Sequence, residues 1–201
     1  MSALPAAKTS LGNFFEDFQL GQTIRHATPR TVTLGDVALY NGLFGARFAV
    51  QSSDVFAQKI SYPRSPLDDL LVFHVVFGKT VADISLNAVA NLGYADCRFL
   101  KPVFPGATLT AVSEVIGLRE NSNRKTGIVY VRSRGFDETG DTVLDYVRWV
   151  MVRKRDGAAP APVEKIPDLP KNVEPAQLGA ACPKINNTSY DTTLAGSPHR
   201  F

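Results

Sequence analysis

The pattern of apolar and polar residues first predicts a long helix. Over residues 65–85 the apolar side chains follow helical spacing and cover every side of the helix. Ser65 followed by Pro66 predicts the N-cap and the first helical position, which puts Asp68 at N3. Because no wide polar stripe remains, the pattern predicts a helix that is buried all round. Such a helix needs a broad apolar partner surface, and the only candidate in this chain is a sheet.

After residue 85 the spacing of the apolar residues changes from helical to alternating. The alternation predicts four strands, at residues 88–100, 107–118, 126–134 and 142–154. Residues 101–106 and 120–125 are rich in turn-forming and polar residues, so they predict connections. The last three strands follow one another in hairpin order, which makes the predicted sheet antiparallel.

The residues before the central helix predict shorter elements. Residues 21–33 predict a strand that is interrupted near Pro29. Thr33 and Asp36 have the spacing of a helix cap, and they predict a short helix that Gly45 ends. A second short helix is expected over Asp54–Lys59.

The two ends of the chain lack any periodic pattern. Residues 1–12 are expected to be disordered. Residues 156–201 hold seven of the 13 prolines, which predicts a linker or a strap over the domain. The predicted domain therefore covers residues 13–155.

A strand, a buried helix and a long antiparallel sheet in this order predict an α+β hot-dog fold, in which the sheet wraps around the central helix. A sheet of this kind leaves edge strands, which proteins commonly protect by pairing two units. We therefore expect a homodimer or a second hot-dog repeat as partner.

The composition narrows the compartment and the ligand. A net charge of +3 over 201 residues gives no global support for nucleic-acid binding. Two cysteines and three histidines have no metal-ligand spacing, so we expect no metal and a reduced cytoplasm. No segment reaches the roughly 20 apolar residues that span a bilayer, and the first ten residues hold no apolar stretch. The prediction is a cytoplasmic protein without a membrane segment.

The start of the central helix is the first candidate binding site. Backbone N–H groups at Leu67, Asp68 and Asp69 are predicted to face a thioester oxygen, together with Ser65 at the cap. The alternative is an ordinary helix cap without a ligand. Because capping accounts for Asp68, Asp69 is the candidate for substrate contact.

Other candidates each have a structural alternative. His74 has the chemistry of a general base, but we favour a core histidine because it lies well inside the predicted helix. Arg47 is a candidate partner for a substrate carboxylate, or an ordinary surface arginine. Arg119, Arg124 and Lys125 form a basic group that fits the phosphates of coenzyme A, or a solvated loop.

Several segments resemble a known family. Residues 98–109 (RFLKPVFPGATL) resemble the strand-turn-strand signature of MaoC-like hydratases, and residues 140–143 are similar to their last hairpin. Residues 24–31, 68–80 and 120–127 resemble the N-terminal half of the mesaconyl-CoA hydratases, also called β-methylmalyl-CoA dehydratases. The likeness covers residues 14–154. It implies two fused hot-dog repeats, an acyl-CoA substrate, no further cofactor, and reversible hydration that interconverts β-methylmalyl-CoA and mesaconyl-CoA.

The chain departs from the MaoC-like pattern at one place. Members carry an Asp-x-Asn-Pro-x-His segment whose acid and histidine activate water, whereas this chain has Ala46 and Gln51 at those positions. Neither side chain accepts a proton at neutral pH. The resemblance therefore implies the non-catalytic repeat, with a second repeat expected after it. The alternatives are an (R)-specific enoyl-CoA hydratase for fatty acyl substrates, a hot-dog thioesterase, and a non-enzymatic acyl-CoA-binding or scaffolding domain.

Overall fold

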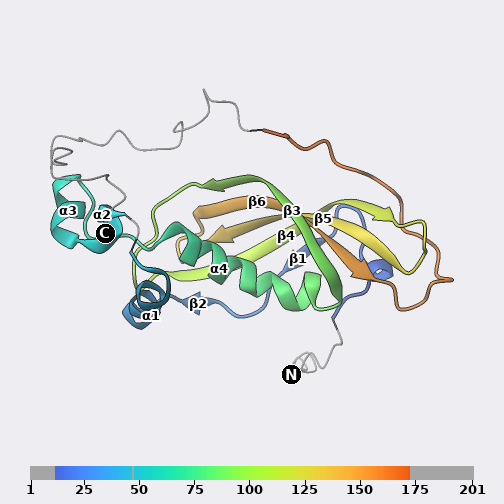
Figure 1. The fold of residues 1–201 in the computed structure, drawn as a ribbon, viewed down its shortest axis with the longest axis horizontal. Coiled ribbons are helices and arrows are strands. Elements are labelled where there is room, and N and C mark those ends of the chain that lie inside the picture. Colours follow the sequence, from blue (N-terminus) through green and yellow to red (C-terminus); the bar gives the residue numbers. More distant parts are fainter. Residues whose placement is uncertain (1–11, 47, 173–201) are drawn as a thin grey trace, which may run out of the picture.

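Helix α4 (Asp69–Thr80) lies against one face of an antiparallel sheet (Figure 1). The computed structural model describes residues 12–46 and 48–172. The strand order is β1-β4-β5-β6-β3, with β2 pairing beside β1 on β4. The other elements are η1 (Phe15–Asp17), β1 (Thr23–Arg25), β2 (Arg30–Thr31), α1 (Leu34–Phe44), α2 (Ala49–Ser52), α3 (Asp54–Lys59), η2 (Val81–Ser85), β3 (Ala88–Phe99), β4 (Thr108–Glu120), β5 (Thr126–Phe136) and β6 (Thr142–Arg153). This arrangement confirms the predicted α+β class.

The alternating pattern located the long strands to within two residues at each end. It also confirms the antiparallel hairpins β4–β5 and β5–β6. Residues 101–106 contain a turn, closed by the hydrogen bond from Ala107 N to Phe104 O. This turn joins strands that are not neighbours, because β3 pairs with β6 at the far side of the sheet.

The predicted start of the central helix was wrong. The cap is Asp68 and not Ser65: the Asp68 carboxylate accepts a hydrogen bond of 2.7 Å from Leu70 N, and the helix begins one residue later. Leu67 N donates to Val103 O at 2.7 Å, which holds the preceding residues extended. Pro66 favours the same extended geometry in Ser65.

The prediction of a helix buried all round was also wrong. One face of α4 packs on the sheet through Leu71, Val72, Val75, Val76 and Thr80. The opposite face leaves Leu70, His74 and Gly78 exposed. Tyr40 of α1 contacts His74 there, and α1 has no buried residue at all. Exposed apolar surface on a central helix is typical of an interaction site.

A belt of polar side chains divides the core into two apolar clusters. On β4, Ser113 separates Ala111 of one cluster from Val115 of the other. Ser133 of β5 pairs with Ser113 in the sheet register, and Arg148 lies between the two clusters on β6. We call the following buried residues the polar belt: His26, Thr80, Asp83, Ser113, Ser133 and Arg148. Polar groups at this depth are tolerated only where partners satisfy them.

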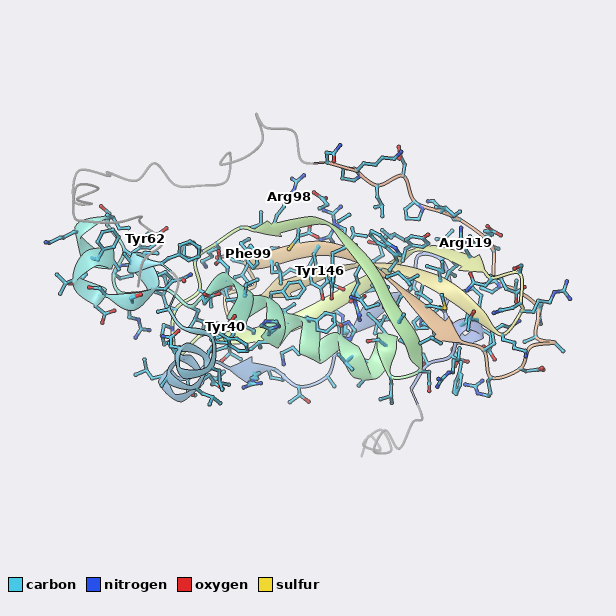
Figure 2. The ribbon with its side chains drawn as sticks, in the orientation of Figure 1. Tyr40, Tyr62, Arg98, Phe99, Arg119 and Tyr146 are labelled. Carbon is cyan, nitrogen blue, oxygen red and sulfur yellow. The ribbon has the colours of Figure 1, made fainter. Side chains whose placement is uncertain are left out.

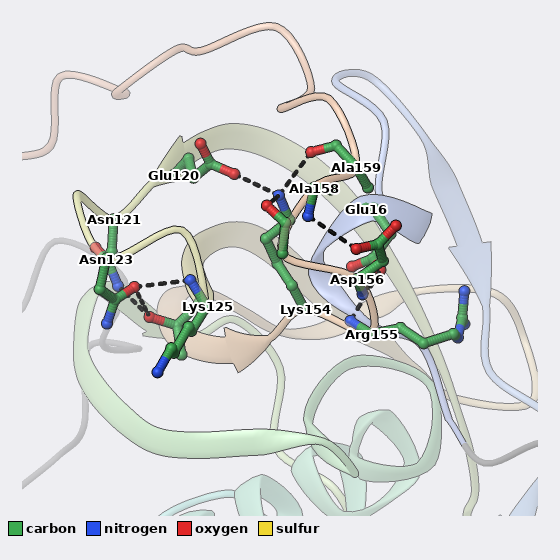
Figure 3. A network of polar contacts seen from close by, with 12 residues as sticks. Glu16, Glu120, Asn121, Asn123, Lys125, Lys154, Arg155, Asp156, Ala158 and Ala159 are labelled. Atoms are coloured by element: carbon green, nitrogen blue, oxygen red, sulfur yellow. Dashed lines mark hydrogen bonds and ion pairs between the residues drawn. The ribbon is translucent and has the colours of Figure 1, made fainter.

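Residues 156–172 run along the domain. Glu16 Oε1 accepts hydrogen bonds from the backbone N of Arg155 and Asp156, at 2.8 and 3.0 Å (Figure 3). Further on, Leu118 of β4 and Lys165 exchange two backbone hydrogen bonds. Residues 1–11 and 173–201 lie outside the described residues, so the bounds of the domain and of the linker stay a prediction. None of the described helices is long and apolar enough to span a membrane.

Candidate functional site

The two positions that the resemblance pairs with the acid and the histidine of MaoC-like hydratases lie beside α2. Gln51 is within α2, and Ala46 precedes that helix. Gln51 Oε1 is buried and has no hydrogen-bond partner among the described residues. Neither an amide nor a methyl group moves a proton at neutral pH, so these positions provide no acid–base pair. Arg47 lies outside the described residues, and its contact with a substrate carboxylate stays a prediction.

The start of α4 offers fewer free N–H groups than the sequence suggests. The prediction for Leu67 was wrong, because its N–H is taken by the carbonyl of Val103. Ser65 N donates to the Asp54 carboxylate at 2.8 Å, which ties this residue to α3. Asp69 is exposed to solvent. The protein around its carboxyl group removes part of the hydration, and this loss together with the adjacent Asp68 carboxylate raises the pKa of Asp69. Substrate contact at Asp68 and Asp69 stays a prediction.

His74 is not a core histidine, and that prediction was wrong. The side chain lies on the open face of α4, with ring centroids 6.2 Å from Tyr40 and 6.0 Å from Phe73. Within the described residues it has no hydrogen-bond partner that would orient it. A general base is normally held by such a partner, so this chain alone shows no prepared base at His74.

The predicted phosphate-binding group lies at the other end of the sheet. Arg119 is the last residue but one of β4, whereas α4 begins near the start of that strand. Figure 2 shows Arg119 far from Tyr62. The 13 residues of β4 correspond to about 40 Å of strand. Asn123 Oδ1 accepts from Lys125 N at 2.9 Å and orders the turn in which Arg124 lies (Figure 3). The structure therefore does not bring these three residues to the helix start, and their contact with coenzyme A stays a prediction.

Part of the polar belt has the order of a nucleophile–base–acid triad. His26 Nδ1 lies 2.8 Å from Asp83 Oδ2, and His26 Nε2 lies 2.7 Å from Ser113 Oγ. Ser113 Oγ is in turn 2.6 Å from Ser133 Oγ. Both serines are fully buried and hydrogen-bonded within the network, so we assign this network a structural role. The sequence did not reveal it, because its members come from four separate segments.

Arg148 is the other charged member of the belt. Its guanidinium is fully buried, Nη2 donates to Thr80 Oγ1 at 2.9 Å, and both terminal nitrogens contact Ser85 Oγ at 3.3–3.4 Å. No described carboxylate lies within 4 Å, and Nε has no partner among the described residues. Burial lowers the pKa of Arg148.

The surroundings of Arg148 only partly offset the cost of its burial. The guanidinium carbon lies 4.6 Å from the centroid of the Phe77 ring, a contact that contributes roughly 0.5–2 kcal/mol. Burying an ion costs several kcal/mol even after relaxation. The buried cation therefore lacks a counter-ion among the described residues.

Two hollows open on the surface, with volumes of about 500 and 390 Å³. The larger lies on the face of the sheet opposite α4 and is lined by Arg25, Arg132 and Arg134 among others. The smaller lies around residues 101–107. None of the candidate residues lines either of these two hollows.

Comparison with known proteins identifies the family. The sequence profile described as "Mesaconyl-CoA hydratase" matches residues 2–176. This chain belongs to the mesaconyl-CoA hydratase family. It is 59% identical over 195 residues to a mesaconyl-CoA hydratase of Cereibacter sphaeroides, which covers 96% of this chain and 56% of that relative. It is 58% identical over 192 residues to a β-methylmalyl-CoA dehydratase of Chloroflexus aurantiacus, which covers 96% of this chain and 54% of the relative.

Solved structures agree with this membership. A MaoC domain protein dehydratase from Chloroflexus aurantiacus matches with a TM-score of 0.81 and 63% identity, over 84% of this chain and 48% of that one. A Mycobacterium tuberculosis protein with a double hot-dog fold matches with a TM-score of 0.70 and 26% identity, over 93% of this chain and 58% of that one. These matches confirm the hot-dog fold. The chain spans about half the length of the curated relatives it matches.

Proposed function

We propose that the chain is one hot-dog half of a hydro-lyase that interconverts β-methylmalyl-CoA and mesaconyl-CoA in the cytoplasm. The observation that carries this proposal is the 59% identity to a mesaconyl-CoA hydratase over nearly the whole chain. The reaction is the reversible addition of water to an enoyl-CoA thioester. Acid–base chemistry is sufficient for it, so we propose that no further cofactor takes part.

We propose that this half is the non-catalytic one. Ala46 and Gln51 support this, because neither replaces the acid–base pair that activates water. His74 lacks an orienting partner among the described residues, and the serines of the polar belt are buried. The catalytic residues then have to come from another hot-dog unit.

A second repeat can supply those residues, whereas a second copy of this chain covers the same surfaces but carries the same Ala46 and Gln51. Two surfaces favour such a partner: the open face of α4, and the outer edge of β3, which pairs on one side only with β6 in the described sheet. The partly buried amide of Gln51 adds an acceptor that a partner can satisfy. Edge strands and apolar faces of this kind are normally covered in the functional protein.

The alternatives differ in the acyl pocket that they need. A fatty acyl hydratase or a thioesterase for fatty acyl groups needs an apolar pocket, whereas a dicarboxylic thioester needs a cation. A scaffolding domain needs no turnover at all.

The test is a substrate comparison. The 201-residue chain is produced together with the part of the Cereibacter sphaeroides relative that it does not cover, and hydration is followed by the double-bond absorbance. We expect turnover of mesaconyl-CoA well above that of crotonyl-CoA, and no thiol release. Equal turnover of crotonyl-CoA favours the fatty acyl alternative. Release of free coenzyme A favours the thioesterase, and absence of any turnover with retained binding favours the scaffold.

A further inference from the structure

The buried guanidinium of Arg148 has no charge partner in the part of the chain that the structure describes. Two hydroxyl oxygens, from Thr80 and Ser85, are the acceptors for its five N–H groups. Thr80 Oγ1 gives its own hydrogen to Phe77 O, so it meets Arg148 as an acceptor only. Replacing such an ion by an apolar side chain of similar shape is often neutral or stabilising, so folding alone does not explain this residue.

The environment of Arg148 suits the carboxylate end of a small acyl group. The aromatic rings of Phe73, Phe77, Tyr94 and Tyr146 form a continuous cluster beside it, with centroids 5.1–6.3 Å apart. These rings provide an apolar wall, and the guanidinium provides a planar fork that matches a carboxylate. Nε lacks a partner, and the only contact of Nη1 is a long one of 3.4 Å, so part of the fork is available. Figure 2 shows Tyr146 in the middle of the molecule, near α4.

A route to this position runs along the edge of the sheet. Tyr94 is directly opposite Arg148 in the pairing of β3 with β6. It is 43% exposed and packs against Phe77 of α4, so it extends from the surroundings of the guanidinium to the surface. Since β3 is the edge strand, no described strand covers Tyr94 from outside. Because the guanidinium is fully buried under these rings, a ligand that reaches it by this route has to displace Tyr94 and Phe77.

We propose that Arg148 binds the free carboxylate of a dicarboxylic acyl-CoA thioester that enters between β3 and α4. The inference rests on the proposed function for the identity of the thioester. In this position the carboxylate supplies the missing counter-ion, while the thioester end remains at the open face of the half. Arg148 then determines specificity for the acyl group and takes no part in proton transfer.

Binding of two acyl-CoA thioesters that have no double bond to hydrate tests this assignment. Succinyl-CoA and butyryl-CoA have the same acyl length and differ in a terminal carboxylate or methyl group. Their affinities are measured by calorimetry on the 201-residue chain combined with the complementary part of the Cereibacter sphaeroides relative. We expect the parent to bind succinyl-CoA more tightly by on the order of 10- to 100-fold. In Arg148→Met the ratio should fall to about 1, and Arg148→Lys should keep part of it.

Two controls separate specificity from folding. Arg134→Met removes an exposed arginine on the opposite face of the sheet, 3.5 Å from Asp145, and should leave the ratio unchanged. Arg148→Met should unfold at the same temperature as the parent or a higher one, because it removes a buried ion without a counter-ion. If this variant does not fold, Arg148→Lys and Arg148→Gln provide the comparison.

The outcomes also separate this proposal from the proposed function. A ratio that survives in Arg148→Met, or a parent without any preference, overturns the role of Arg148. A lowered unfolding temperature together with an unchanged ratio assigns Arg148 a purely structural role. Binding of these two thioesters does not depend on turnover, because neither has a double bond to hydrate. A preference for succinyl-CoA without turnover of mesaconyl-CoA therefore rejects the hydratase function alone. Turnover of mesaconyl-CoA without a preference rejects the role of Arg148 alone.

Discussion

The close approach of α4 to the sheet makes a double-variant cycle at Gly135 and Val76 informative. A Cβ atom added at Gly135 would lie 2.6 Å from Val76 Cγ2 and 3.1 Å from Cγ1. Gly135→Ala should therefore overpack the core and cost about 1–3 kcal/mol of unfolding free energy. Val76→Ala removes two buried methyl groups and should cost about 2–3 kcal/mol.

In the double variant the new methyl group fills the space that Val76 vacates. The two costs should then fall short of additivity by about 1–2 kcal/mol. Equilibrium urea unfolding of the parent, both single variants and the double variant measures this coupling. Gly78→Ala is the matched control, because an added Cβ there meets nothing within 4 Å, and it should stabilise α4 by about 0.5–1 kcal/mol. Strictly additive costs would show that Val76 does not lie over Gly135.

Two further predictions concern buried and charged groups. His26→Leu deprives the Asp83 carboxylate of its 2.8 Å partner, so it should cost about 3–5 kcal/mol in urea unfolding, and a loss below about 1 kcal/mol would contradict the structural role of the polar belt. Although burial opposes it, hydrogen bonds from Lys101 and Thr139 lower the pKa of Asp137 to about 2. A lowered folded-state pKa gives stability that is present above the unfolded pKa and is lost as the pH falls through the folded one. Asp137→Asn should therefore flatten the loss of stability between about pH 4 and pH 2, and an acid limb that matches the parent's would exclude this contribution.

Local signals in the sequence were sufficient for most elements. The alternation of β5 and the capping box of Thr33 and Asp36 both involve neighbours in the chain, and the structure confirms both. The prediction of the start of α4 was wrong because the deciding hydrogen bond, from Leu67 N to Val103 O, joins residues that are far apart in the sequence. A cap pattern at Ser65 was present but lost to this tertiary hydrogen bond.

The candidate site was less predictable than the fold. The apolar residues of α4 predicted burial on every side, whereas the structure leaves one side exposed. Arg148 lies in a strand of alternating residues. The local pattern does not tell whether its side chain points into the core or toward solvent. Its position became apparent only from the register of β6 against β3 and from the packing of Phe77.

Hydration of mesaconyl-CoA by the chain with and without a partner unit tests the central claim most directly. The purified 201-residue chain should fold, yet show turnover at the uncatalysed background, because Ala46 and Gln51 provide no acid–base pair. Addition of the complementary part of the Cereibacter sphaeroides relative should raise turnover by about 10²–10⁴-fold, which is the typical contribution of acid–base catalysis. The variant Ala46→Asp/Gln51→His serves as a comparison that returns the pair to this half. Robust turnover by the unmodified chain alone would contradict the account and place the catalytic groups within residues 1–201.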